Sequence, residues 1–261
     1  TLTEPRQKIK WSTVCAIREL SEIAEIGIVT GSDHDYLVEQ CRELWYGLNS
    51  APPSRITLMP CNGTKMYKYS LDKRKWELKH SRDMRQEIGQ KNYNYLLSSL
   101  MSYQIVLSCR EDVPFSGTFF HFRESMLNWC PIGRKATQAE REAWKRVDTE
   151  KGLREHYLEL LRNEIATMEI SVTAALGGST SIDIYPEGWD KTYALQHFEG
   201  HTCWFVGDKC QPNGNDHLIF EAASAHGRGY VTKSPENTEK IIKDISKQIK
   251  AAQDVDQEKE S

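Results

Sequence analysis

Two aspartates, Asp208 and Asp216, lie eight positions apart in GDKCQPNGND (207–216), directly after the apolar run CWFVG (203–207). Carboxylate oxygens are preferred ligands of Mg²⁺, and one or two suffice because the ion keeps several waters. The Pro, Asn and Gly between the aspartates favour a turn that folds the second carboxylate back toward the first. From spacing alone, the alternative is a surface turn with two solvated acids.

A second set of residues combines guanidinium groups with a polar strand face. Its members are Arg123, Arg134, Arg141, Ser181 and Asp183. In an extended strand SIDIY (181–185), Ser181 and Asp183 share one face and the isoleucines occupy the other. Guanidinium groups bind phosphate oxygens through paired N–H groups, and Ser and Asp side chains bind sugar hydroxyls. The alternative is a solvated polar face, with Arg141 an exposed charge on a helix.

The elements around Asp208 predict an α/β sheet. Residues 11–25 have helical apolar spacing with Ser12 as the expected N-cap, and 35–45 resume that spacing. The short apolar runs 26–30 and 203–207 are typical of buried parallel strands. Ligands of such sheets gather beyond the carboxyl ends of the strands, where Ser32 and Asp208 are expected.

The middle of the chain has a different pattern. Residues 117–133 and 169–186 are rich in β-branched and aromatic residues, with hairpin-like breaks at Glu124-Ser125 and Gly177-Gly178. Two helical runs separate them, the first opening with Thr137 and Glu140 in capping-box spacing. We therefore predict an inserted α+β domain with an antiparallel sheet, residues 79–187, between the two parts of an α/β core, residues 1–78 and 188–261.

Composition excludes several classes of protein. With 34 basic and 37 acidic residues the net charge is −3, which argues against a general nucleic-acid-binding surface. No apolar run approaches the ~20 residues of a membrane span. Seven scattered cysteines form no C-x-x-C pair, which disfavours a disulfide framework or a zinc site and favours a reducing cytoplasm. The polar tail 251–261 is expected to fray.

Four blocks in order resemble the haloacid dehalogenase superfamily and, within it, the eukaryotic-type phosphomannomutases. The blocks are TLTEPRQKI (1–9), GTFFHFRESMLNWCPIGR (117–134), SIDIYPEGWDKTYAL (181–195) and GDKCQPNGNDHLIF (207–220). The resemblance covers most of the chain and is weakest over residues 33–120. It implies a Rossmann-like core with a parallel sheet and an inserted cap domain with an antiparallel sheet.

The resemblance assigns roles in the core. Ser32 matches the phosphate-binding hydroxyl, Lys191 the lysine that offsets phosphoryl charge, and Asp208 the Mg²⁺ ligand, with Asp216 in the neighbouring acidic position. The family's nucleophilic aspartate, and the aspartate that moves protons two residues later, would immediately precede Thr1. Because the match resumes at the next residue of that motif, we expect that these two aspartates are missing because the sequence is truncated.

A second cation site is less well matched. Phe220 is positioned to supply a backbone carbonyl, but Ala222 and Ala225 stand in a loop where many relatives carry an aspartate and a threonine. Cys61 stands where the family usually has a glutamate before Asn-Gly. These departures from the family pattern are compatible with a substrate preference that differs from that of the family.

In the cap, the resemblance implies that Arg123, Arg134, Arg141, Ser181 and Asp183 hold the distal phosphate and the sugar hydroxyls, with Arg6 added from the core. The expected activity is a Mg²⁺-dependent interconversion of mannose 6-phosphate and mannose 1-phosphate, with hexose 1,6-bisphosphate as activator and intermediate. We expect a cytoplasmic protein that feeds GDP-mannose synthesis and dimerises through the cap. The alternatives are a sugar-phosphate phosphatase of the same superfamily and a non-catalytic sugar-phosphate-binding protein that has lost the nucleophile.

Overall fold

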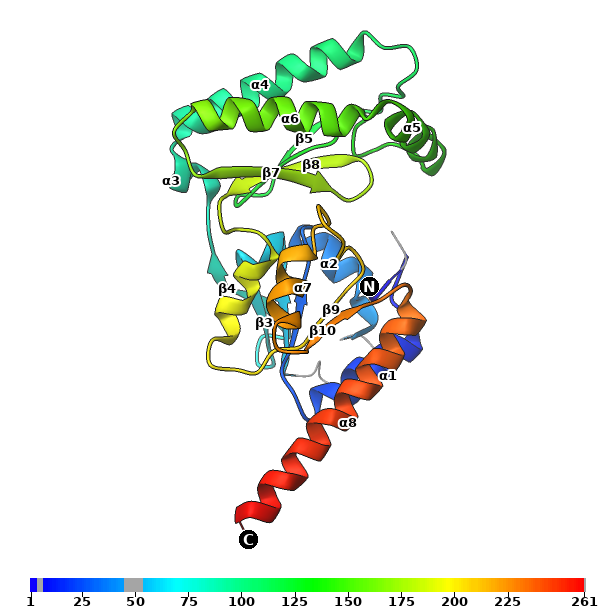
Figure 1. Cartoon of the computed structure of the whole chain (residues 1–261), viewed down its shortest axis with the longest axis vertical. Coiled ribbons are helices and arrows are strands. Elements are labelled where there is room, and N and C mark those ends of the chain that lie inside the picture. Colours follow the sequence, from blue (N-terminus) through cyan, green and yellow to red (C-terminus); the bar gives the residue numbers. More distant parts are fainter. Residues whose placement is uncertain (4–6, 45–53, 261) are drawn as a thin grey trace. The chain divides into compact units, whose positions relative to one another are not determined.

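The computed structural model describes residues 1–3, 7–44 and 54–260, with side chains as far as Asp254 in the last helix. The chain forms two compact units (Figure 1). Unit 1 contains Thr1–Ser81 and Lys191–Ser261, and unit 2 contains Arg82–Asp190. The fold is α/β, with parallel strand pairs in unit 1 and a separate antiparallel sheet in unit 2, as the sequence predicted.

The described part of unit 1 has two sheets. The first has the order β1-β2-β3-β4, in which β1 and β2 are parallel and the following pairs are antiparallel. The second is the parallel pair β9 and β10. The strands are β1 (Ile26–Val29), β2 (Ile56–Met59), β3 (Lys65–Ser70), β4 (Lys75–Ser81), β9 (Phe205–Gly207) and β10 (Gly229–Val231).

Helices cover these sheets and close the core. They are α1 (Trp11–Ser21), α2 (His34–Gln40), η1 (Arg42–Leu44), η2 (Cys61–Gly63), η3 (Lys191–Phe198), α7 (His217–Ser224) and α8 (Pro235–Glu260). An apolar cluster joins α1 to β1, β2 and α8, and Val14, Leu44 and Leu58 in it are completely buried. A second cluster joins Phe205 of β9 to Ile219 of α7.

Two local predictions in unit 1 are wrong. The N-cap of α1 is Lys10, and the hydroxyl of Ser12 instead donates to Glu239 on α8 at 2.6 Å, because α1 packs along α8. Helix α8 extends to Glu260, so the backbone of the tail is helical where fraying was expected. The first error comes from a helix partner more than 200 residues away, which local sequence spacing does not show.

Unit 2 is an antiparallel sheet with helices packed on it (Figure 1). The strand order is β5-β6-β8-β7. Its elements are α3 (Met84–Ile88), α4 (Gln90–Ser108), β5 (Phe120–Phe122), β6 (Leu127–Trp129), α5 (Gln138–Lys151), α6 (Leu153–Thr167), β7 (Val172–Gly177) and β8 (Ser181–Pro186). The predicted breaks at Glu124-Ser125 and Gly177-Gly178 lie between paired strands, and the capping box of Thr137 and Glu140 is formed.

Apolar and polar side chains alternate along β6 and β8, so the sheet of unit 2 has one apolar and one polar face. Trp129 and Ile182 are paired and completely buried, and the indole N–H of Trp129 donates to Gln104 of α4 at 2.8 Å. Asn128 and Asp183 are also paired, one position along each strand, so they lie on the opposite face. The core therefore lies between the sheet and the helices, and polar groups gather on the other face.

No helix in the described chain combines the length and apolar character needed to cross a bilayer.

The seven cysteines are all free thiols. Burial raises the pKa of Cys41 to about 12 and that of Cys210 to about 11, whereas Cys109 is exposed. Because the thiolate is the reactive form, iodoacetamide at pH 8 is expected to label Cys109 and to spare Cys41 and Cys210 in the native protein. Mass spectrometry of peptides labelled before and after denaturation measures this. Rapid native labelling of Cys41 would contradict the described packing of α2.

Candidate functional site

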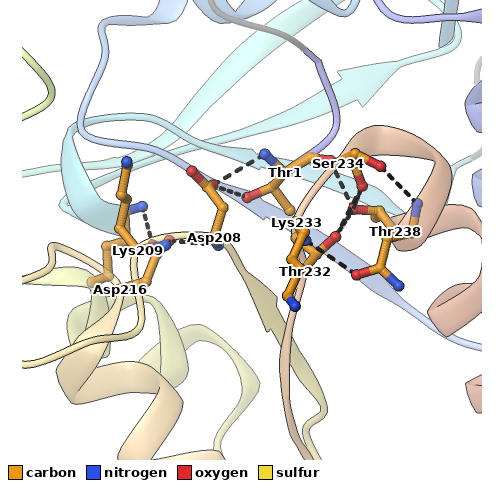
Figure 2. Close-up of polar contacts among 10 residues, drawn as sticks. Thr1, Asp208, Lys209, Asp216, Thr232, Lys233, Ser234 and Thr238 are labelled. Carbon is orange, nitrogen blue, oxygen red and sulfur yellow. Dashed lines mark hydrogen bonds and ion pairs between the residues drawn. The ribbon is translucent and has the colours of Figure 1, made fainter.

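Asp208 is the first residue after β9, and its carboxylate faces Thr1 (Figure 2). Its Oδ1 accepts hydrogen bonds from the Thr1 nitrogen at 3.0 Å and from the Thr1 hydroxyl at 2.5 Å. The side chain is 40% exposed. Burial alone would raise the pKa of Asp208, but the Thr1 hydrogen bonds and the charges of the terminal ammonium and Lys191 hold it below its usual value. Asp208 is therefore a solvent-accessible carboxylate at neutral pH.

Asp216 has a different environment. It is 3% exposed, and its Oδ2 accepts from the backbone N–H groups of Asp208 at 3.1 Å and Lys209 at 2.9 Å (Figure 2). Its Oδ1 forms an ion pair with the Lys191 ammonium at the start of η3. Both carboxylate oxygens thus bind groups of the protein. Asp216 fixes the backbone at Asp208 and holds Lys191 beside it.

The turn between the two aspartates depends on Gly214. A Cβ there would lie 2.0 Å from the backbone oxygen of Lys209, the same oxygen that accepts the Asp216 N–H at 3.1 Å. We expect Gly214→Ala to lower the free energy of unfolding by about 1–3 kcal/mol, because the backbone must move away from the methyl group. Urea denaturation measures the effect. Gln211→Ala, an exposed change in the same turn, is the control and is expected to change stability by less than about 0.5 kcal/mol. Equal stabilities for the two variants would contradict this geometry.

Ser32 follows β1 in a turn that packs against η2. Its carbonyl accepts the Cys61 N–H at 2.9 Å, and its own N–H donates to the Thr30 hydroxyl at 3.2 Å. Gly63 of η2, with a φ of +89°, approaches Ala194 of η3 so closely that a Cβ would lie 2.7 Å from the Ala194 Cα. The turn of Ser32 is thereby linked through η2 to the helix that begins with Lys191. Within the described residues the Ser32 hydroxyl makes no hydrogen bond.

In unit 2, Arg123 and Asp183 lie together with Asn128. The amide nitrogen of Asn128 donates to Asp183 Oδ1 at 2.6 Å, and Arg123 Nη1 lies 3.9 Å from the same oxygen. The side chains of Arg123 and Asp183 are only 7% and 14% exposed. The Asn128 carbonyl oxygen is buried without a hydrogen-bond partner in the described structure. Asn128 was not predicted, because its position opposite Asp183 depends on strand register.

Arg141 extends from α5 to two neighbouring backbone segments. It donates to the carbonyls of Ala136 at 3.1 Å and Arg134 at 2.8 Å, and to the Thr180 hydroxyl at 3.1 Å. Ser181 follows Thr180 and pairs with Gly177 across the β7–β8 hairpin. Arg141 therefore connects the loop that carries Arg134 to the start of β8. The alternative of a solvated helix charge is wrong for Arg141, which is only partly exposed.

The structure gathers the predicted residues into two groups, one in each unit. Unit 1 joins Lys191, Asp208 and Asp216, and unit 2 joins Arg123 to Asp183 and Arg141 to the loop of Arg134. A Cβ at Gly229 would lie 2.9 Å from the Phe220 carbonyl oxygen, and a role of Phe220 at a metal stays a prediction. Arg6 lies outside the described residues. The sequence did not predict that Thr1 contacts Asp208 or that Thr180 contacts Arg141, because both contacts join segments distant in the chain.

No group of three or more His, Cys, Asp or Glu side chains suited to a metal occurs in the described residues. The single accessible carboxylate of Asp208 still suits Mg²⁺, which is commonly held by one or two carboxylates, several waters and substrate phosphate.

Comparisons with known proteins identify relatives of the chain. The chain is 31% identical over 248 residues to a phosphomannomutase of Glycine max, covering 94% of this chain and 92% of that protein. It is 33% identical over 229 residues to a phosphomannomutase of Drosophila melanogaster, covering 85% and 82%, and 31% identical over 248 residues to phosphomannomutase 1 of Homo sapiens, covering 94% and 88%.

Solved structures show the same fold at low identity. A haloacid dehalogenase-like hydrolase from B. subtilis matches with a TM-score of 0.56 and 12% identity, over 93% of this chain and 95% of that one. An N-terminally truncated IMP-nucleotidase of Plasmodium falciparum matches with a TM-score of 0.61 and 13% identity over 93% of this chain, which spans only 66% of that nucleotidase. The profile described as eukaryotic phosphomannomutase matches residues 14–248. The chain therefore belongs to the eukaryotic phosphomannomutase family, a family of enzymes with a haloacid dehalogenase-like fold.

Proposed function

We propose that this protein interconverts mannose 6-phosphate and mannose 1-phosphate through an aspartyl-phosphate, with hexose 1,6-bisphosphate as intermediate and activator. The product would serve GDP-mannose synthesis in the cytoplasm, a location consistent with the seven free thiols. Family membership supports the activity. The observation that carries the proposal is the buried pair of Lys191 and Asp216 beside the exposed carboxylate of Asp208.

Unit 1 would bind the phosphoryl group that is transferred. Asp208 would hold Mg²⁺, which supplies positive charge to the phosphoryl oxygens when bound. Lys191 would donate to the same phosphoryl group, and the Ser32 hydroxyl would donate to another of its oxygens. Asp216, whose oxygens are engaged by Lys191 and two backbone N–H groups, would keep the ammonium and the Asp208 backbone in place. This assigns Asp216 a positioning role near the metal rather than direct coordination.

Unit 2 would bind the other phosphate and the sugar hydroxyls. Guanidinium groups suit phosphate oxygens because their N–H groups are planar and paired, which supports Arg123, Arg134 and Arg141 as the phosphate-binding set. Asp183 and Ser181 would accept hydrogen bonds from hydroxyls. The buried carbonyl oxygen of Asn128 is a further acceptor on the Asp183 face. A mutase needs this second anion site, since its intermediate carries two phosphates.

The test compares two products from the protein expressed from its complete gene. Isomer conversion of mannose 6-phosphate is measured with Mg²⁺ and hexose 1,6-bisphosphate, and release of inorganic phosphate is measured in the same samples. The proposal predicts that conversion exceeds release and requires the bisphosphate. Phosphate release without conversion would show a phosphatase, and neither product would favour a binding protein. Reading the codons before Thr1 separately tests for the expected Asp-x-Asp-Gly.

We also propose a homodimer formed through unit 2. Four apolar side chains of α4 are strongly exposed, namely Tyr95, Met101, Ile105 and Val106. Such a patch on one helix is typical of a protein–protein contact. We expect Ile105→Asp to convert the dimer into a monomer, because it places a charge in an apolar contact. Light scattering during gel filtration measures the mass. Lys91→Asp, an exposed change on the same helix, is the control; a monomeric parent protein would refute the dimer.

A further inference from the structure

Helix η3, which begins with Lys191, is an unusually long 3₁₀ helix. It runs over eight residues, whereas 3₁₀ helices rarely exceed about four because their hydrogen bonds are poorly aligned. Contacts with other elements must therefore hold η3 in place. Because Lys191 is its first residue, these contacts also fix where the Lys191 backbone lies.

The middle and the end of η3 are held by η2. The Nε2 of His197 lies 2.7 Å from the Gly63 carbonyl oxygen, and since a carbonyl only accepts, this nitrogen carries a hydrogen and donates it. Gly63 also approaches Ala194, where a Cβ on the glycine would lie 2.7 Å from the Ala194 Cα. Two contacts thus attach η3 to the same turn.

The start of η3 is held by β4. The Tyr193 hydroxyl and the His80 Nε2 form a hydrogen bond of 3.0 Å, and Tyr193 is only 8% exposed. The rings of His80, Tyr193 and His197 also contact one another, with centroids 5.1 to 6.0 Å apart. The position of Tyr193, two residues after Lys191, therefore depends on His80.

The same hydrogen bond joins two segments that are far apart in the sequence. The chain leaves unit 1 after Ser81 and returns to it at Lys191. His80 directly precedes the first of these points, and Tyr193 closely follows the second. Inside unit 1, the bond therefore ties together the two segments that lead to and from unit 2.

The side chain of Lys191 is held at its far end by Asp216, with which its ammonium forms an ion pair. Asp216 is itself fixed by the backbone N–H groups of Asp208 at 3.1 Å and Lys209 at 2.9 Å. A lysine side chain is a flexible four-carbon stem, so the ammonium is held firmly only when the backbone is fixed as well. In Lys191 that backbone belongs to η3.

We propose that His80 and Tyr193 are positioning residues for Lys191. Their hydrogen bond fixes the start of η3 and thereby keeps the Lys191 ammonium against Asp216, beside Asp208. The consequence for catalysis rests on the proposed function, in which Lys191 donates to the phosphoryl group. The consequence for the Lys191 side chain does not.

The test measures the Lys191 side chain directly. Reductive methylation with formaldehyde, without Mg²⁺ or substrate, is followed at Lys191 by peptide mass spectrometry, with the exposed Lys247 as internal reference. Tyr193→Phe and His80→Ala each remove the hydrogen bond. Both are expected to raise the methylation rate of Lys191 by ~3–10-fold, because an amine released from its ion pair reacts faster. The rate at Lys247 should stay unchanged.

Two further variants are matched controls. The amide of His80→Gln can donate to or accept from the Tyr193 hydroxyl, and this variant should bring the methylation rate to within ~2-fold of the parent. Tyr69→Phe removes a hydroxyl of β3 that makes no hydrogen bond within the described residues, and it should leave the rate at Lys191 unchanged.

The isomer-conversion assay measures the catalytic consequence. Tyr193→Phe is expected to lower kcat by ~3–10-fold, and adding it to Lys191→Met should lower kcat no further, because both changes act through the same ammonium. Faster methylation with an unchanged kcat would support the positioning and remove Lys191 from the proposed mechanism. The proposal is overturned by unchanged methylation in both Tyr193→Phe and His80→Ala, by an equal increase in Tyr69→Phe, or by a failure of His80→Gln to restore the rate.

Discussion

Replacing Lys191 with methionine is expected to lower the free energy of unfolding by about 3–5 kcal/mol and the proposed mutase rate by ~10²–10³-fold. The loss of stability follows because Asp216, with 4% of its side chain exposed, would keep its charge without its ammonium partner. Removing one member of a buried ion pair leaves an uncompensated charge, which is the costly change. The loss of rate follows because a donor to the phosphoryl oxygens disappears.

The control for this prediction is Lys209→Met. This variant removes the same charge close to the site, but the Lys209 side chain is exposed, and it is the backbone N–H and carbonyl of Lys209 that contact Asp216. We expect its stability to change by less than about 0.5 kcal/mol. Urea denaturation followed by circular dichroism and the isomer-conversion assay measure both variants. Equal effects would show that net charge near the site matters and that the Lys191–Asp216 pair does not.

A second comparison separates the stability of the pair from its chemistry. In the double variant Lys191→Met and Asp216→Asn, no buried charge remains, and the amide oxygen of the new asparagine side chain could still accept the two backbone N–H groups. Stability is therefore expected to recover by about 2 kcal/mol relative to Lys191→Met alone. The rate is expected to stay low. Recovery of the rate would remove Lys191 from the proposed mechanism.

The sequence predicted the elements that local patterns specify. The apolar run before Asp208 is β9, the breaks at Glu124-Ser125 and Gly177-Gly178 separate hairpin strands, and Thr137 caps α5 with Glu140. These features depend on residues within a few positions of one another, so spacing and turn chemistry are sufficient to identify them. The family resemblance was also correct, because its blocks are long and in order.

Contacts between distant segments could not be predicted in the same way. The pairing of Asn128 with Asp183 depends on the register of β6 against β8, and Thr1 reaches Asp208 across more than 200 residues. Asp216 was grouped with Asp208 because of its residue type. Its oxygens, however, bind Lys191 and two backbone N–H groups, and only three-dimensional proximity shows this.

In unit 2, Arg123→Met is expected to lower the free energy of unfolding by about 3 kcal/mol. The Arg123 guanidinium lies 3.9 Å from Asp183 Oδ1, both side chains are largely buried, and the carboxylate would lose this neighbouring positive charge. The same variant is expected to raise the KM for the sugar phosphate at least tenfold, because a proposed phosphate ligand is lost. Urea denaturation and steady-state kinetics measure the two effects separately.

The matched control is the double variant Arg123→Met and Asp183→Asn. Without a carboxylate at position 183 there is no unpaired charge, and an asparagine oxygen there can still accept the Asn128 amide, which now donates to Asp183 at 2.6 Å. We therefore expect stability to recover by about 1–2 kcal/mol while the KM stays high. A double variant as unstable as Arg123→Met would mean that the arginine stabilises unit 2 through its packing. A normal KM in either variant would exclude Arg123 from phosphate binding, and the second anion site would then have to rest on Arg134 and Arg141 alone.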